Sequence, residues 1–182
     1  RIVVLGAHYD TVPNVPGAND NGSGIATLLE VASVIANKEY AFTVEIVMFG
    51  AEEIGLFGSR YYVKELDDNK RTNTIAMLNF DALGSGKNPG IYGDPELLDV
   101  LGQYASTSGI EVEKKNSMAP GTSSDHAPFS EAGIPVGFFV ADDFSKIHSP
   151  EDTLEFVRPE LLGSAVAMTV ALLDQLDARA WD

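Results

Sequence analysis

Short apolar runs alternate with longer segments of helical periodicity along this chain. The apolar runs are rich in β-branched residues, which is typical of buried strands. They predict strands at residues 2–5, 43–49, 74–79, 91–92, 111–115 and 135–140. Apolar residues at helical spacing predict helices at residues 23–36, 56–66, 95–107 and 159–176. Ser23 is suited to cap the first of these helices. The alternation predicts an α/β fold with a mostly parallel sheet and helices on both faces.

The irregular segments between these elements hold most of the unusual polar residues. They span residues 8–22, 50–55, 81–90, 116–125 and 142–153. The first three and the last follow apolar strands. In open α/β sheets, ligands bind in the crevice beyond the carboxyl ends of the strands. We therefore expect the functional site at that edge of the sheet.

The composition is ordinary for a globular protein of one domain, with 182 residues of which 45% are apolar and 21% are charged. Asp and Glu total 27 against 12 Lys and Arg, which gives a formal net charge of −15. Such a chain repels a phosphate backbone and an anionic membrane surface, so neither nucleic acid nor a membrane is an expected partner. With no Cys, disulfide scaffolds, thiolate zinc sites, iron–sulfur clusters and cysteine nucleophiles are excluded.

Two polar motifs precede the first predicted helix. His8 follows the first strand, where an imidazole can ligate a metal ion. Asp10 lies two residues further, on the same side of an extended chain, and can orient a metal ligand. Taken alone, a surface histidine in a turn is the more ordinary interpretation. Asp20 lies in a Gly-rich loop, where it is either a turn residue or a ligand.

Three later segments carry similar residues. Glu52 and Glu53 follow the second strand, and two adjacent carboxylates near a core need a neutralising partner. In an extended segment they face opposite ways, so one can bind metal while the other is a general base. The alternative is a helix N-terminus that collects acidic residues. Asp81 ends the next buried strand, and His148 lies in the loop before the last helix.

Together these residues predict a metal site. Two of only three histidines and three carboxylates are expected beside strand ends of one sheet, namely His8, Asp20, Glu53, Asp81 and His148. Nitrogen and oxygen ligands without sulfur suit zinc, with manganese or cobalt as substitutes. One bridging carboxylate and two further ligands per ion predict two Zn²⁺ ions about 3.5–4 Å apart.

Five ordered motifs give the chain a resemblance to a known family. They are His-x-Asp at residues 8–10, Gly-Ala-Asn-Asp-x-Gly-x-Gly at 17–24, Gly-Ala-Glu-Glu-x-Gly-Leu-x-Gly-Ser at 50–59, Asn-Phe-Asp at 79–81 and His-x-Pro-x-Asp-Thr at 148–153. The chain resembles the double-zinc aminopeptidases of metallopeptidase family twenty-eight, which include aminopeptidase Y-like enzymes and have glutaminyl cyclases and glutamate carboxypeptidase as relatives. The segment at residues 124–129 also matches, and the resemblance spans residues 3–173.

The resemblance implies a fold and an activity. The fold is a three-layer α/β/α sandwich with a mostly parallel mixed sheet, of the phosphorylase/hydrolase-like kind, with one catalytic domain over residues 1–182. The activity is that of a secreted metallo-aminopeptidase, which uses two zinc ions to hydrolyse the N-terminal residue from peptides with a free N-terminus. The resemblance gives no oligomeric state.

The family's roles carry over to this chain position by position. The implied metal ligands are His8 and Asp81 for one zinc ion, Glu53 and His148 for the other, and Asp20 as the bridge. The implied catalytic residues are Glu52, as the general base, and Asp10, which orients the first imidazole. We expect Asp125 to support the site, and His126 to line the substrate pocket or the core.

The chain departs from the family pattern at two places. The family core has a further helix and strand before the first ligand, whereas this sequence enters an apolar run at Ile2. We therefore expect these upstream elements to be missing. Some members place a Tyr beside the last histidine ligand to stabilise the oxyanion, and this chain has Ile147 there. Tyr92, Tyr9 or the zinc alone would then carry that role.

Four alternatives stay open. A glutaminyl-cyclase-like acyltransferase uses one zinc ion and lacks the full ligand set around the first histidine. This chain has that motif intact, with His8 and Asp10, which argues against such an enzyme. A carboxypeptidase that acts on acidic C-termini needs a basic pocket, and little Arg lies near the motifs. A non-catalytic metal-binding relative would have lost ligands. A structural domain with Ca²⁺-binding loops would favour oxygen ligands, and two histidines count against it.

Overall fold

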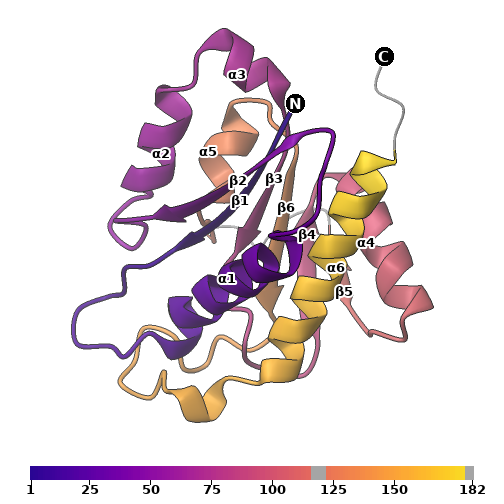
Figure 1. Cartoon of the computed structure of the whole chain (residues 1–182). Coiled ribbons are helices and arrows are strands. Elements are labelled where there is room, and N and C mark those ends of the chain that lie inside the picture. Colours follow the sequence, from indigo (N-terminus) through magenta and orange to yellow (C-terminus); the bar gives the residue numbers. More distant parts are fainter. Residues whose placement is uncertain (116–121, 179–182) are drawn as a thin grey trace.

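Figure 1 shows a sheet with helices packed on both of its faces. The computed structural model describes residues 1–115 and 122–178. Its strands are Ile2–His8 (β1), Thr43–Phe49 (β2), Thr74–Phe80 (β3), Pro89–Gly93 (β4), Glu113–Lys115 (β5) and Val136–Ala141 (β6). Its helices are Gly24–Ile35 (α1), Phe57–Lys64 (α2), Asp68–Asn73 (α3), Pro95–Thr107 (α4), His126–Glu131 (α5) and Pro159–Asp177 (α6), with short helical turns at Ala18–Ser23 (η1) and Leu154–Phe156 (η2).

The sheet is mixed and mostly parallel. Its strand order is β2-β1-β3-β6-β4-β5. β1 pairs in parallel with β2 and β3, and β3 pairs in parallel with β6. β4 runs antiparallel to β6 and parallel to β5, which is the edge strand that the alternating pattern at residues 111–115 predicts. The register places His8 beside Phe49, so the polar segments after β1 and β2 begin at the same edge of the sheet.

Alternate strand residues pack into two separate cores, because successive side chains point to opposite faces. On one face, Leu5 of β1 packs in a cluster with Leu28 of α1 and Leu172 of α6. On the other face, Val4 packs in a cluster with Phe129 of α5. Figure 1 shows the same division, with α1, α4 and α6 on one side of the sheet and α2 and α5 on the other. The three-layer α/β/α sandwich that the resemblance implies is therefore confirmed.

The predicted boundaries agree best where an element is long and strongly patterned. β2 and α4 have the predicted bounds, whereas β1 continues three residues beyond the predicted strand and ends at His8. The apolar pattern does not predict α3 or α5. Each of these helices has six residues, which is too short for an apolar stripe to repeat.

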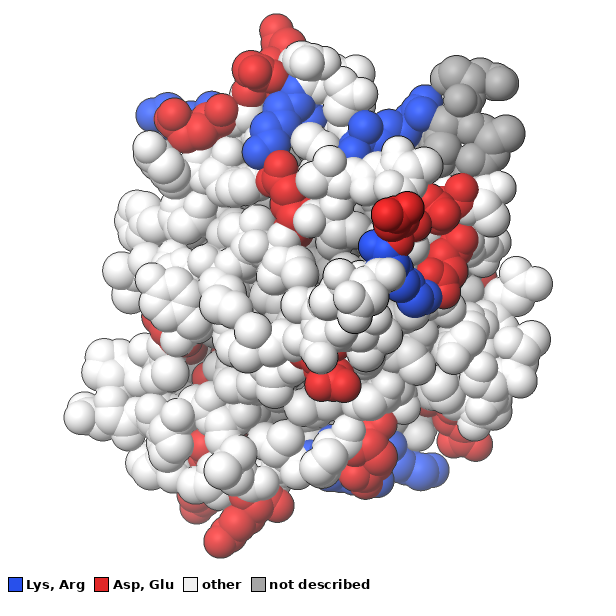
Figure 2. Space-filling view, viewed as in Figure 1, with Lys and Arg blue, Asp and Glu red and all other residues white. Residues whose placement is uncertain are grey.

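The surface of the described residues combines acidic groups with exposed apolar side chains. Figure 2 shows Asp and Glu mostly around the margin of one face, with a broad central area that carries little charge. None of the helices within residues 1–115 and 122–178 is both long and apolar enough to cross a membrane.

Candidate metal centre

The carboxyl ends of β1, β2 and β3 and the segment before α6 meet at one edge of the sheet, and the predicted ligands come from these places. His8 ends β1, Glu53 follows β2 and Asp81 follows β3. Asp20 lies in η1 and His148 lies between β6 and η2. The structure brings all five side chains together. Of three groups of described residues that could hold a metal ion, two together contain all five and share one member. These two groups are His8, Asp20 and Asp81, and Asp20, Glu53 and His148.

Asp20 lies at the centre of the arrangement. Its Oδ1 is 3.2 Å from His8 Nε2, and its Oδ2 is 3.0 Å from His148 Nε2. Two imidazoles from distant parts of the chain therefore face the two oxygens of one carboxylate. That is the placement expected for a carboxylate shared by two ions.

A further carboxylate flanks each imidazole. Asp81 Oδ1 is 3.3 Å from His8 Nε2, and Glu53 Oε2 is 3.1 Å from His148 Nε2. In each group, one ligand atom per residue lies within 4.8 Å of the others. Among the described residues, Glu53 Oε1 is buried and has no hydrogen-bond partner. A buried oxygen without a partner is costly, so the residues present fit a divalent cation.

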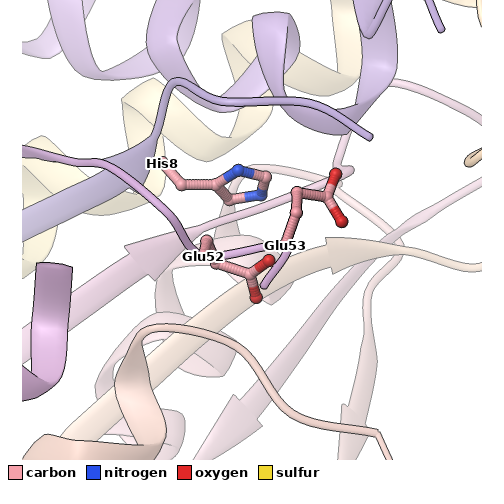
Figure 3. A group of neighbouring side chains, drawn as sticks. All are labelled: His8, Glu52 and Glu53. Atoms are coloured by element: carbon pink, nitrogen blue, oxygen red, sulfur yellow. The ribbon is translucent and has the colours of Figure 1, made fainter. Parts of the chain in front are cut away.

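Glu52 and Glu53 do not lie in an extended segment, and the expectation that they face opposite ways is wrong. Ala51 has a positive φ of 58°, and the backbone N–H groups of Gly55 and Leu56 both donate to the Glu52 carbonyl. This turn brings both carboxylates to the same space as the His8 ring, as Figure 3 shows. The alternative of a helix N-terminus also fails, because α2 begins only at Phe57.

The close carboxylates and their burial shift several pKa values in the metal-free chain. Burial, followed by the charge of Asp81, raises the pKa of Glu52 to about 8. Burial alone would lower the pKa of His8, but its contacts with Asp20 and Asp81 outweigh burial and raise that pKa to about 12. Burial also raises the pKa values of Asp20 and Glu53. At neutral pH in the metal-free chain, protons bound to His8 and Glu52 thus reduce the negative charge that metal cations would otherwise neutralise.

Asp10 binds the turn that carries the two glutamates. Its Oδ1 accepts the N–H of Glu52 at 3.1 Å and its Oδ2 accepts the N–H of Glu53 at 3.3 Å. The His8 ring lies closer to the backbone carbonyl of Asp10, at 3.1 Å from Nδ1, than to Asp10 Oδ1, at 3.7 Å. Asp10 thus contacts His8 through its main chain and the glutamate turn through its side chain.

Asparagines hold the loop that carries Asp20. Asn19 Oδ1 accepts the N–H of Gly84 at 2.7 Å, and Asn21 Nδ2 donates to the Phe80 carbonyl at 2.8 Å. These contacts join η1 to the segment that follows β3. Ser23 lies at the N-cap position of α1, as predicted, but its hydroxyl donates to the Asn19 carbonyl at 2.6 Å and makes no cap hydrogen bond.

Ser124 is a supporting residue that sequence reasoning did not single out. Its hydroxyl donates to Asp81 Oδ2 at 2.6 Å and accepts from Asn79 Nδ2 at 2.8 Å, and all three residues are buried. Ser124 thereby fixes the carboxylate oxygen that points away from His8. Its place in the matching segment at residues 124–129 was the available signal.

The two neighbours of Ser124 lie outside the candidate ligand groups. Burial raises the pKa of Asp125 to about 6. Burial lowers the pKa of His126 to about 4, and its ring stacks on Phe138 at 4.5 Å between centroids. This neutral, stacked ring agrees with the expected core or pocket position of His126.

A cavity of about 570 Å³ opens onto the candidate ligands. Its lining includes acidic residues, Asp20, Glu52, Glu53 and Asp81, together with His148. It also includes large apolar residues, namely Leu56, Phe138, Val140, Phe144 and Ile147. The described residues that line the cavity include neither Tyr9 nor Tyr92, the two tyrosines suggested for an oxyanion role.

Comparison with known proteins identifies the family of this chain. The model of "Peptidase family M28" matches residues 1–173. The chain belongs to peptidase family M28. It is 35% identical to "Aminopeptidase YwaD" of Bacillus subtilis over 93% of this chain and 40% of that protein. It is 42% identical to "Probable lipoprotein aminopeptidase LpqL" of Mycobacterium tuberculosis over 75% of this chain and 31% of that protein.

Two solved structures of enzymes have the same fold as this chain. BSAP, a zinc aminopeptidase from Bacillus subtilis, gives a TM-score of 0.87 at 31% identity over 96% of this chain and 46% of that chain. A glutaminyl cyclase from an Acidobacteriales bacterium gives a TM-score of 0.84 at 27% identity over 98% of this chain and 70% of that chain. The chain thus spans less than half the length of the aminopeptidases named here.

Proposed function

We propose that this chain is the catalytic part of a metallo-aminopeptidase with two zinc ions, and that residues 1–182 form one catalytic domain. The observation that carries the proposal is the position of Asp20, whose two oxygens face the imidazole at the end of β1 and the imidazole in the segment before η2. The proposed ligands are His8 and Asp81 for one ion, Glu53 and His148 for the other, and Asp20 for both. Imidazole and carboxylate donors without thiolate suit zinc. The family and its zinc aminopeptidase structures support the same activity.

The proposed roles of the chain's own groups follow from their positions. Zinc bound at such a site lowers the pKa of water and polarises a carbonyl oxygen. Glu52 lies beside the cluster, and burial and the charge of Asp81 raise its pKa to about 8 in the metal-free chain. Bound cations would favour its charged form, which is the form that accepts a proton. We assign it the proton of the attacking water, which it then passes to the leaving amine. Asp10 holds the turn that carries Glu52 through that residue's N–H.

The cavity supports hydrolysis at the N-terminal end of a peptide. Its acidic residues can attract a free α-ammonium group, and its lining within the described residues includes no Lys or Arg to bind a C-terminal carboxylate. A carboxypeptidase is therefore disfavoured. The apolar lining residues, which include Phe138, Val140 and Phe144, support a preference for a large apolar first residue.

The test combines metal analysis with an assay. The purified protein is expected to hold two zinc ions per chain and to hydrolyse leucyl-anilide, and a chelator should abolish hydrolysis until zinc is restored. Glu53→Ala should lose zinc, with Glu65→Ala on the exposed surface as the matched control. Zinc-free protein with full activity, or unchanged zinc in Glu53→Ala, would contradict the proposal.

A glutaminyl cyclase activity is the second candidate, supported by the structural likeness to the Acidobacteriales enzyme. An N-terminal glutaminyl peptide separates the two activities, because ring closure releases ammonia whereas an aminopeptidase releases free glutamine. We propose secretion as well, with the lipoprotein relative LpqL as support. Detection of the protein in washed cytosol alone would rule secretion out.

A further inference from the structure

Two aspartates hold the loops of the candidate centre in the same way. Asp10 accepts the backbone N–H groups of Glu52 and Glu53, and those contacts belong to the site already described. Asp152 accepts the backbone N–H groups of two successive residues of η1, the second of which is Asp20. In both cases one carboxylate binds two neighbouring amides, and the second amide belongs to a proposed ligand.

Asp152 is buried among these contacts. None of its surface is exposed, Oδ1 accepts from Asn19 at 2.8 Å and Oδ2 accepts from Asp20 at 3.0 Å. Its backbone carbonyl accepts from Ala18 at 3.3 Å. Burial of a carboxylate is costly unless its oxygens are hydrogen-bonded, and here each oxygen has a donor. Asp152 therefore fixes three successive amides at the start of η1.

The same residue is also tied to His148. The N–H of Asp152 donates to the Ser149 carbonyl at 3.1 Å, which closes the turn directly after His148. Asp152 is therefore joined to His148 through a short hydrogen-bonded turn and to Asp20 through its carboxylate. These are the two residues whose Oδ2 and Nε2 atoms lie 3.0 Å apart.

We propose that Asp152 is a positioning residue that sets the separation of Asp20 and His148 and thereby the metal affinity of the centre. This inference rests on the proposed zinc function. The contacts that orient metal ligands commonly change metal affinity or activity by about 10- to 100-fold when they are lost. A purely structural aspartate would instead lower the stability of the fold and leave metal affinity unchanged.

Asp152→Asn is the variant that separates these roles. The side chain keeps its shape, but its NH₂ group faces a backbone N–H where an oxygen accepted before, so one amide of η1 loses its partner. Asp94→Asn is the matched control. Asp94 Oδ2 also accepts a backbone N–H across two segments, from Val136 at 2.7 Å, but at the amino end of β6, away from the ligands.

The measurements are zinc affinity by competition with a chromophoric chelator, the visible spectrum of the cobalt-substituted protein, and thermal unfolding of the metal-free protein. We expect Asp152→Asn to weaken binding of at least one ion about 10- to 100-fold and to change the cobalt spectrum. Asp94→Asn keeps an oxygen that can accept the N–H of Val136, and both metal readouts should stay at wild-type values. Wild-type affinity and an unchanged cobalt spectrum in Asp152→Asn would overturn the inference.

Hydrogen exchange of the metal-free wild-type protein gives a second test, which does not depend on whether a variant folds. The amides of Asn19 and Asp20 should exchange slowly, because a buried carboxylate holds them. Exchange as fast as in exposed loops would also overturn the inference. If the wild type itself binds no zinc, the proposed function fails and the inference fails with it. Zinc binding by the wild type with unchanged affinity in Asp152→Asn removes only the role of Asp152.

Discussion

At the residue scale, the environment of Glu52 sets its proposed chemistry. Burial and the charge of Asp81 raise its pKa to about 8, whereas Asp10 fixes its backbone and leaves its carboxylate free of that contact. A carboxylate held in this way can accept a proton without leaving its place. Glu53, its neighbour, instead faces His148 at 3.1 Å. The turn around Ala51 thus gives two identical side chains different surroundings.

Glu52→Gln should keep both zinc ions and lose most turnover. The amide has nearly the same shape but cannot accept the proton of the attacking water, and general base catalysis commonly supplies about 10²- to 10⁴-fold in rate. The measurements are zinc content and leucyl-anilide turnover at saturating substrate, with exposed Glu65→Gln as control. Normal turnover with full zinc content would remove Glu52 from the role of base.

Zinc binding should release protons and tighten as pH rises. His8 has a pKa of about 12 in the metal-free chain, because its contacts with Asp20 and Asp81 outweigh burial, so it carries a proton at neutral pH. Zinc must displace that proton to bind the imidazole. With one proton released, the dissociation constant should fall about tenfold per pH unit between roughly pH 6 and 8. Calorimetry in buffers of different ionisation enthalpy counts the protons, and a pH-independent constant would contradict this account.

At the element scale, the sequence pattern predicts the long elements and fails on short ones. The apolar stripe of α4 and the β-branched run of β2 are long enough to give their bounds. α3 consists of polar residues alone, and α5 carries one large apolar side chain, Phe129, so neither shows a period. The antiparallel direction of β4 also leaves no mark in so short a run. Tertiary contacts, and not the local sequence pattern, determine that α3 and α5 form and that β4 runs antiparallel.

The candidate site also combines features that the local sequence pattern predicts with features that depend on contacts between distant residues. Strand ends place His8, Glu53 and Asp81 at one edge, and the order of motifs along the chain is enough to expect this. The turn at Ala51 and the contact of Asp152 with Asn19 are different. The contact between Asp152 and Asn19 joins residues 133 positions apart. The sequence around Asp152 is equally typical of an ordinary turn.

Phe129→Ala should destabilise the fold without changing the metal centre directly. Phe129 is fully buried and lies 6.0 Å from the ring of Phe49 and 5.5 Å from that of Tyr62, so it fixes α5 against β2 and α2. Removal of such a ring typically costs about 3–5 kcal/mol. Denaturant unfolding measures the loss. Phe57→Ala, at a side chain that is 59% exposed, is the control and should change stability by less than about 0.5 kcal/mol.

At the scale of the whole molecule, the candidate centre connects segments that the sheet alone does not hold together. The residues that face one another there come from the ends of β1, β2 and β3, from η1 and from the segment before η2. Asp20, Glu53 and Asp81 are close enough to repel one another when they are charged. A pair of divalent cations would remove this repulsion and join the five segments. Metal removal should therefore lower the stability of the entire fold and not only that of the site.

Chelation should lower the melting temperature of the protein. Free zinc at about 1,000 times its dissociation constant stabilises the folded state by about 4 kcal/mol for each ion bound. For a domain of this size, 1 kcal/mol corresponds to a shift of about 2–4 °C, so each bound ion should raise the melting temperature by roughly 8–16 °C. Glu53→Ala, which lacks one proposed ligand, should show a smaller zinc-dependent difference, while Glu65→Ala should match the wild type. If zinc leaves the wild-type melting temperature unchanged, these loops are held by protein contacts alone, and Asp20 joins two imidazoles without a cation between them.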